Sequence, residues 1–171
     1  MKERLKTSER HESMRGYFAY YLLEAMAEDK DIWLITGDLG YGMMDSLQAR
    51  YPERFINAGA AETNMMGVAV GLAMEGKKPF VYSITTFLLR RPYETLKLYV
   101  DEERVPVRLI GGGRDKDYSH DGPSHDSSDA KQLLATLPNI QQLWPKTKEE
   151  IQDMVKLMVE STEPVFISLR R

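Results

Sequence analysis

Apolar residues alternate along the chain between two patterns of spacing. The first begins after Ser13, where apolar side chains recur at three- and four-residue steps and predict a helix that ends near residues 28–30. These side chains are Met14, Phe18, Tyr21, Leu22 and Met26. The second pattern is the short apolar run at residues 32–36, which predicts a buried strand. Glycines at residues 37–40 then indicate that this strand ends in a loop.

The same alternation of strand and helix continues to the end of the chain. Further strands are predicted at residues 55–57, 79–84, 105–110, 140–143 and 165–169. Further helices are predicted at residues 45–51, 61–75, 93–103, 129–136 and 147–160. A long loop is expected at residues 111–128. This order predicts an α/β fold with a mostly parallel sheet and helices on both of its faces.

Length and composition indicate one ordinary globular unit. The chain has 171 residues, which suits a single α/β domain with a sizeable core. We expect this domain to occupy residues 13–171, after a flexible polar arm at residues 1–12. No internal repeat, low-complexity tract or linker indicates a second domain.

Charge and cysteine content narrow the class of protein. Lysine and arginine number 23 and aspartate and glutamate 26, so the net charge of −3 gives no electrostatic reason to expect nucleic acid or a membrane as partner. Cysteine is absent, which excludes disulfides, thiolate metal sites and cysteine nucleophiles. The charged N-terminus lacks the apolar run of a secretory signal, and no stretch approaches the roughly 20 apolar residues of a membrane-spanning helix. We therefore expect a cytoplasmic protein.

The unusual residues lie in the loops that follow four predicted strands, where ligands collect in parallel sheets. These loops are residues 37–42, 58–64, 85–93 and 111–125. Taken singly, their residues have ordinary structural explanations. Glu62, for example, occupies the first turn of a helix, where the helix dipole favours a carboxylate without any function. The glycines of the first loop do not match the dinucleotide pattern G-x-G-x-x-G, so they do not predict a phosphate cradle.

Taken together, the loop residues resemble a known family. In chain order they are Asp38-Leu39, Ala61-Glu62, Thr86-Phe87, Arg91-Pro92-Tyr93 and the run from Asp121 to His125. Over residues 32–145 this order resembles the pyrimidine-binding domain of transketolase and of deoxyxylulose-phosphate synthase. Residues 55–64 look like the family's segment around its catalytic glutamate. Residues 120–125 resemble its Asp-Gly-Pro-Thr-His signature, with Ser124 in place of threonine.

The resemblance implies that thiamine diphosphate binds between two domains and that this domain holds its aminopyrimidine ring. Glu62 is then the catalytic glutamate, which hydrogen-bonds ring nitrogen N1′ and so promotes loss of the proton from C2 of the thiazolium ring. Either Phe87 or Tyr93 supplies an aromatic face for the pyrimidine. Leu39 is expected near the thiazolium, with Asp38 beside it.

The resemblance also implies a substrate side and a missing half. His125, as a second catalytic residue, and Asp121 would contact the hydroxyl and carbonyl oxygens of the donor, where charge develops. Arg91 and His120 are expected to complete the substrate-binding site for a sugar or sugar phosphate. In the family Mg²⁺ is held by a Gly-Asp-Gly stretch and an asparagine of the other domain, of which residues 37–40 are only a partial echo. No metal ligand is therefore expected in this chain.

These expectations predict the pyrimidine-binding subunit of a split transketolase-like transferase, which moves a two-carbon ketol unit between sugars. A separate subunit would carry the diphosphate-binding domain and the Mg²⁺ ligands, in a heterotetramer. One alternative is the small subunit of another thiamine-dependent enzyme, either a 2-oxo acid decarboxylase or dehydrogenase or a deoxyxylulose-phosphate synthase. Others are a catalytically silent binding subunit, against which the retained Glu62 argues, and a flavodoxin-like nucleotide-binding module, against which the glycine pattern argues.

Overall fold

The sheet is built from six parallel strands. The computed structural model describes residues 11–171, so the predicted arm at residues 1–12 lies outside it except for the last two residues. The strand order is β2-β1-β3-β4-β6-β5, and every neighbouring pair is parallel. The strands are β1 (Ile32–Thr36), β2 (Phe55–Asn57), β3 (Lys78–Ile84), β4 (Arg108–Gly112), β5 (Gln141–Leu143) and β6 (Val165–Leu169). The predicted parallel α/β fold is confirmed.

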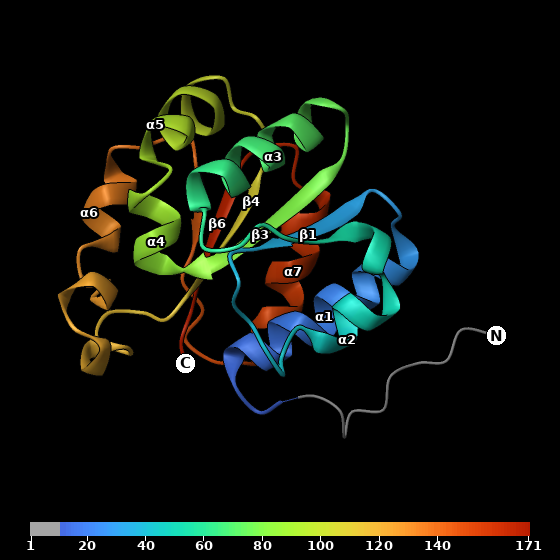
Figure 1. The fold of residues 1–171 in the computed structure, drawn as a ribbon, viewed down its shortest axis with the longest axis horizontal. Coiled ribbons are helices and arrows are strands. Elements are labelled where there is room, and N and C mark those ends of the chain that lie inside the picture. The colour runs from blue at the N-terminus through green and yellow to red at the C-terminus, as the bar shows by residue number, and fades with distance from the viewer. Residues whose placement is uncertain (1–10) are drawn as a thin grey trace.

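Helices cover both faces of this sheet (Figure 1). On one face lie α1 (Met14–Glu28), α2 (Asp45–Arg50) and α7 (Ile151–Glu160). On the other lie α3 (Glu62–Met74), α4 (Thr85–Arg90), α5 (Tyr93–Thr95), the π-helical segment η3 (Leu96–Glu102) and α6 (Ala130–Ala135). Among residues 11–171, the short 3₁₀ helices are η2 (Pro52–Arg54), η4 (Ser119–Asp121) and η5 (Pro123–His125). None of the helices described is long and apolar enough to cross a bilayer.

Successive residues of the central strands point into two separate cores. In β3, Phe80 and Tyr82 pack among the residues of α1 and α7, whereas Val81 packs among those of α3 and α4. In β6, Ile167 packs on the side of α1 and α7, and Phe166 packs on the side of α3 and α4. Because both faces are covered, the strands have continuous apolar sequences with no polar face. This explains why the apolar runs predicted strands without showing the alternation typical of a half-exposed sheet.

Several elements differ from the sequence-based prediction, among them α7, which begins at Ile151 instead of residue 147. Helix α4 was expected to be loop, and it forms because its buried Leu88 and Leu89 pack into the second core. Strand β4 begins at Arg108 instead of residue 105, since Pro106 has no amide hydrogen to donate to a neighbouring strand. The helix predicted at residues 93–103 is present, but most of it is the π-helical segment η3.

Buried arginines satisfy the free carbonyls where two helices end. Arg54 donates to the carbonyl oxygens of Met26 and Asp29, at 3.1 and 3.0 Å, at the end of α1. Arg108 donates to the carbonyl oxygens of Met158 and Ser161, at 3.0 and 2.6 Å, at the end of α7. Burial lowers the pKa of Arg108 to about 10. These carbonyls lack helical partners, so both arginines serve as structural caps.

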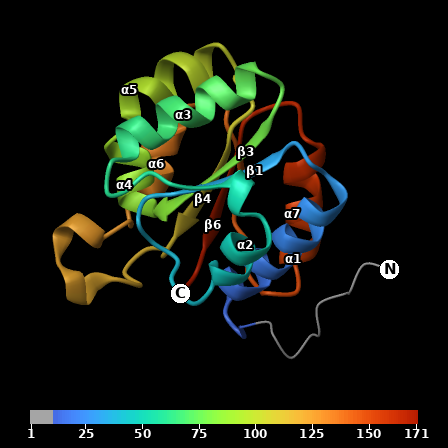
Figure 2. The same ribbon diagram turned by 45° about the vertical axis from the view of Figure 1, so that its right-hand side comes forward.

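The strand order creates a crevice at one end of the sheet. From β1 the chain passes to β2 on one side of it, and then crosses to β3 on its other side. At such a switch point the connections leaving the two central strands run in opposite directions, and a crevice opens beyond their carboxyl ends. Figure 2 shows the segment with η4 and η5 extending from this same end of the domain, beside α4.

Candidate functional site

Glu62 lies at the switch point, at the start of α3. Its side chain is only 2% exposed. Ser83, near the end of β3, has its hydroxyl 3.4 Å from the Oε1 atom of Glu62. A Cβ atom at Gly37, which follows β1, would lie 3.6 Å from that same oxygen. The carboxyl group is therefore held between the ends of β1 and β3, and a Cβ atom at position 37 would be in ordinary van der Waals contact with it.

Arg91 provides the positive charge that this buried carboxylate requires. Its Nη1 atom donates to Oε2 of Glu62 at 2.6 Å, and its own side chain is 45% exposed. The Cζ atom of Arg91 also lies 3.8 Å from the centre of the Phe87 ring, one helical turn earlier. Stacking of a guanidinium on an aromatic face is attractive in itself. Glu62, Arg91 and Phe87 thus form one compact group.

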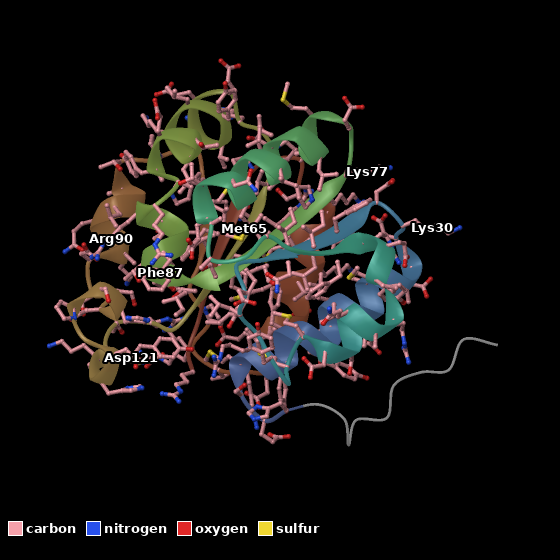
Figure 3. The ribbon with its side chains drawn as sticks, in the orientation of Figure 1. Lys30, Met65, Lys77, Phe87, Arg90 and Asp121 are labelled. Atoms are coloured by element: carbon pink, nitrogen blue, oxygen red, sulfur yellow. The ribbon has the colours of Figure 1, made fainter. Side chains whose placement is uncertain are left out.

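His125 joins this group from the long loop. Its ring lies 4.8 Å from that of Phe87 at an interplanar angle of 70°, an edge-to-face arrangement. Its Nδ1 atom is 3.0 Å from the Ser124 hydroxyl. Figure 3 labels Phe87 on α4 and Asp121 on the loop beneath it. The packing of η5 against α4 is what brings the third and fourth candidate loops together.

Asp121 and His120 lie farther out on the same loop. His120 Nε2 is 3.3 Å from Oδ2 of Asp121, and it is 3.4 Å from Nη1 of Arg171. Both side chains are exposed. None of their contacts among the described residues reaches Glu62, so these two residues form an outer polar group at the rim of the site.

Asp38 links the first two loops. Its carboxylate oxygen Oδ1 accepts hydrogen bonds from the Tyr41 hydroxyl and, at 3.0 Å, from the Asn57 amide. The Asn57 oxygen accepts in return from the backbone N–H of Asp38 at 3.0 Å. Leu39 beside it is half-buried against the core on the α1 side. The loops after β1 and β2 are therefore joined by side-chain hydrogen bonds, and Asp38 takes a left-handed backbone conformation to make them, with φ of 59°.

The Tyr41 and Asn57 hydrogen bonds hold the pKa of Asp38 below its ordinary value of 3.8. We predict that Tyr41→Phe raises this pKa toward 3.8, because one donor to the ionised carboxylate is lost. The bonds stabilise the loop pair above pH 3.8, and this stabilisation is lost as pH falls through the depressed pKa. Titration of the Asp38 carboxyl carbon by NMR measures the shift, with Tyr99→Phe as an exposed control. An unchanged midpoint in Tyr41→Phe would contradict the assignment.

The structure separates the two aromatic candidates. Phe87 contacts both Arg91 and His125. Tyr93 instead packs with the second core, and its hydroxyl is 2.6 Å from Oγ1 of Thr136. Phe87 is therefore the aromatic side chain that is joined to Glu62, through Arg91.

Several residues at the site were missed by sequence reasoning. Tyr118 receives a hydrogen bond from Nη1 of Arg15 at 2.7 Å, and its ring lies against Gly113, where a Cβ would overlap it. Thr86, next to Phe87, has a buried hydroxyl without a hydrogen-bond partner among the described residues. Thr86 belongs to the Thr86-Phe87 pair of the family resemblance but was given no role, and Tyr118 was indicated only by its place in a candidate loop. Arg15 lies in the first predicted helix, where nothing indicated a site.

An open depression leads to Glu62 along the exposed side of α3. Its lining residues are Ala60, Ala61, Glu62, Thr63, Asn64, Gly67 and Arg91. Within residues 11–171, no group of three or more histidine, aspartate and glutamate side chains is placed to hold a metal ion. The site thus offers a buried acid, an aromatic face and an approach for a ligand.

The fold defines a class of protein, namely α/β domains with a topological switch point in a parallel sheet, the place where ligands commonly bind in such domains. The particular family follows from comparison with known sequences. The chain belongs to the transketolase pyrimidine-binding domain family, whose model matches residues 11–171. The family resemblance read from the loop motifs is confirmed.

Individual relatives support this assignment. One subunit of the apulose-4-phosphate transketolase of Phocaeicola vulgatus is 30% identical over 92% of this chain. The 1-deoxy-D-xylulose-5-phosphate synthase 2 of Geobacter sulfurreducens is 32% identical over 93% of it. The chain spans 51% of the first of these proteins and 25% of the second.

Solved structures share the fold. A split-gene transketolase described as an inactive beta4 tetramer superposes with a TM-score of 0.81 and 30% identity, over 93% of this chain and 51% of that one. The transketolase of Leishmania mexicana, at 18% identity, has the same fold with a TM-score of 0.83 over 98% of this chain and 26% of that one.

Proposed function

We propose that this chain is the pyrimidine-binding subunit of a thiamine-diphosphate-dependent, transketolase-like transferase. The observation that carries the proposal is the position of Glu62, buried at the switch point, beside Phe87 and at the end of an open depression. A buried acid next to an aromatic face is the arrangement that a flat, protonatable heterocycle requires. The relatives of this chain include a transketolase subunit, which fits the same assignment.

The residues present fit the aminopyrimidine ring. A carboxylate oxygen of Glu62 would accept a hydrogen bond from ring nitrogen N1′ and hold a proton there. Phe87 would pack against the ring, and the unpaired hydroxyl of Thr86 is a further hydrogen-bonding group in the same helix turn. Thiamine diphosphate, when bound, supplies the carbon nucleophile that forms and breaks carbon–carbon bonds. The chain's own task is to orient the ring, exclude water from Glu62 and control one proton.

The substrate side would be formed by the long loop. His125 is half-buried against Phe87 and would donate a hydrogen bond to a donor oxygen as charge develops on it. Asp121 and His120, which lie at the rim, would contact hydroxyl or phosphate groups farther along the sugar. Asp38 and Leu39 would support the cofactor from the loop after β1. Tyr93 supports the helical layer and is the weaker candidate for stacking, because it faces Thr136.

The other half of the site is proposed to lie on a separate subunit. Within residues 11–171, no group of three or more acidic or histidine side chains is placed to hold a metal ion, which fits Mg²⁺ ligands supplied by another chain. The chain also spans only about half of the transketolase subunit and of the split-gene protein that it matches. We infer that a partner chain carries the diphosphate-binding domain and the Mg²⁺ ligands, in a heterotetramer with two copies of each. We place this assembly in the cytoplasm, with neither nucleic acid nor membrane as a partner.

One experiment separates the transferase from its alternatives. The chain and its partner are incubated with cofactor, Mg²⁺ and either a ketose phosphate with an aldose acceptor or a 2-oxo acid. Formation of a ketose two carbons longer than the aldose acceptor, together with an aldose two carbons shorter than the ketose donor, supports the proposal. Release of carbon dioxide from the 2-oxo acid would instead identify an enzyme of the decarboxylase, dehydrogenase or deoxyxylulose-phosphate synthase type. Turnover of neither, with intact cofactor binding, would indicate a silent subunit.

We predict that His125→Ala slows ketose turnover by about 10²-fold, because a hydrogen-bond donor to the developing charge is lost. Cofactor affinity should change little, since the ring of His125 contacts Phe87 in an edge-to-face arrangement and, among the described residues, none of its hydrogen bonds or ring contacts is with Glu62. Steady-state kinetics on the assembled enzyme and calorimetric titration with thiamine diphosphate measure the two effects. The matched control is His11→Ala, an exposed histidine that hydrogen-bonds Ser13 at the start of α1. Normal donor kinetics in His125→Ala would remove this residue from the site.

A further inference from the structure

Arg91 makes the two interactions that a flat, protonated heterocycle would make here: a hydrogen bond to Glu62 and stacking on Phe87. Its guanidinium is planar and cationic, donates to Oε2 of Glu62 at 2.6 Å, and stacks with Cζ 3.8 Å from the centre of the Phe87 ring. The second oxygen, Oε1, faces inward toward Ser83 and Gly37. Oε2 is therefore the oxygen on the accessible side of the carboxyl group, and Arg91 occupies it.

We propose that Arg91 is a displaceable stand-in for the cofactor's pyrimidine ring. In the cofactor-free protein its guanidinium holds the place between Glu62 and Phe87, and it must leave that place when the ring enters. This inference rests on the proposed function, and it adds a role for Arg91 that differs from the expected one in substrate binding. A ring stacked on the covered face of Phe87 and bonded to Oε2 cannot coexist with the guanidinium seen there.

The surroundings of Arg91 favour such movement. It is the first residue after α4, and its side chain is 45% exposed. Its backbone is fixed separately, because the Thr63 hydroxyl donates to the Arg91 carbonyl at 3.2 Å. The side chain can therefore rotate into solvent while the chain around it stays in place. The neighbouring Arg90 is directed elsewhere, with its Nη2 atom 2.8 Å from both carboxylate oxygens of Asp129.

Arg91 supplies the counter-charge that Glu62 needs when no cofactor is bound. A carboxylate that is 2% exposed is strongly destabilising when it lacks a cation, so Glu62 needs a counter-charge whenever no ligand is present. The contact between Arg91 and Glu62 also weakens cofactor binding. Only the fraction of molecules in which Arg91 has moved away can bind the cofactor, and the apparent affinity is reduced by that fraction. The Arg91–Glu62 contact thus lowers the affinity for the cofactor while it stabilises the cofactor-free protein.

The test compares Arg91→Met with Arg90→Met in the complex with the partner subunit. Calorimetric titration with thiamine diphosphate at saturating Mg²⁺ should show roughly three- to tenfold tighter binding for Arg91→Met. Arg90→Met should bind within about twofold of the parent, because its surface ion pair contributes little. Unchanged or weaker binding in Arg91→Met would overturn the proposal, and a raised KM for sugar with unchanged cofactor affinity would assign Arg91 to the substrate instead.

A second readout uses the cofactor-free chain and does not depend on activity. Arg91→Met should lower the thermal midpoint by several degrees, and Glu62→Gln/Arg91→Met should recover most of that loss, because no charge is then left buried. Additive effects of the two changes would overturn the pairing. If the parent complex binds no thiamine diphosphate at all, the proposed function fails, whereas the coupling between residues 62 and 91 remains a separate result.

Discussion

Glu62→Gln is expected to reduce two-carbon transfer by about 10²- to 10⁴-fold, the range typical of removing a proton-transfer group. The amide has the shape of the carboxyl group, and it can keep the contact with Ser83 at the end of β3. It has no negative charge, however, and it cannot stabilise a proton on ring nitrogen N1′. The fold should persist because a buried charge is replaced by a neutral group of equal size, while the partly exposed Arg91 turns to solvent.

The decisive measurement is exchange of the C2 proton of bound thiamine diphosphate for deuterium, followed by quenched-flow NMR. Glu75→Gln is the matched control, because Glu75 lies at the other end of α3 and is exposed. Exchange in Glu62→Gln at the rate of the parent would exclude the assigned role. Slow exchange in both variants would point to a general defect of the helix and would equally contradict a specific role for Glu62.

The second large effect is dependence on a partner. We expect the chain by itself to bind thiamine diphosphate weakly and to show no transketolase turnover. Its described residues contain no cluster for Mg²⁺, and the depression at Glu62 is open. The charged diphosphate would therefore remain in solvent. Adding the partner subunit should produce tight, Mg²⁺-dependent binding together with activity, which calorimetry and a coupled assay measure on the same samples.

The control for this experiment combines the unchanged partner subunit with the Glu62→Gln variant of this chain. Assembly should proceed and cofactor should still bind, but turnover should stay low, because the diphosphate and Mg²⁺ contacts lie on the other chain. Tight Mg²⁺-dependent binding and turnover by the isolated chain would overturn the split-enzyme proposal. Failure of the mixture to bind cofactor would do so as well, provided that light scattering shows the two chains assembled.

Gly67 and Gly71 on the exposed side of α3 are consistent with close approach of another subunit. A Cβ atom at either position would meet nothing within 4 Å among the described residues of this chain. Internal packing of the described part of the chain therefore does not require these glycines. Whether the partner subunit covers this face can be read from hydrogen exchange of α3 with and without the partner.

The order of strands and helices could be predicted from the sequence because both follow from local spacing. Continuous apolar runs identified β1, β3 and β6, and three- to four-residue steps identified α1 and α7. Alternation of the two then predicted the parallel sheet, since parallel neighbours require a crossover between them. Local patterns were weaker where packing decided the outcome. Helix α4 forms on buried leucines, and strand β4 begins late because of Pro106.

At the site, the residue types and their chain order were visible in the sequence, and so was their place beyond the strand ends. Glu62, Phe87, Arg91 and His125 could be proposed as neighbours because parallel strands bring their following loops to one edge. The individual contacts that each of these residues makes could not be predicted. The choice of Phe87 over Tyr93 depends on how α4 turns between β3 and the second core.

Only the tertiary structure decided which charges meet. Nothing in the local sequence distinguishes Arg90 from Arg91, yet one pairs with Asp129 at the surface and the other with buried Glu62. Likewise, Arg15 reaches Tyr118 across 103 positions of the chain. Spacing along the chain encodes secondary structure, because its hydrogen bonds and apolar faces are local. Ion pairs and ring contacts depend instead on the directions of the side chains after packing. One residue along a helix turns the side chain by about 100°, so adjacent residues such as Arg90 and Arg91 meet different partners.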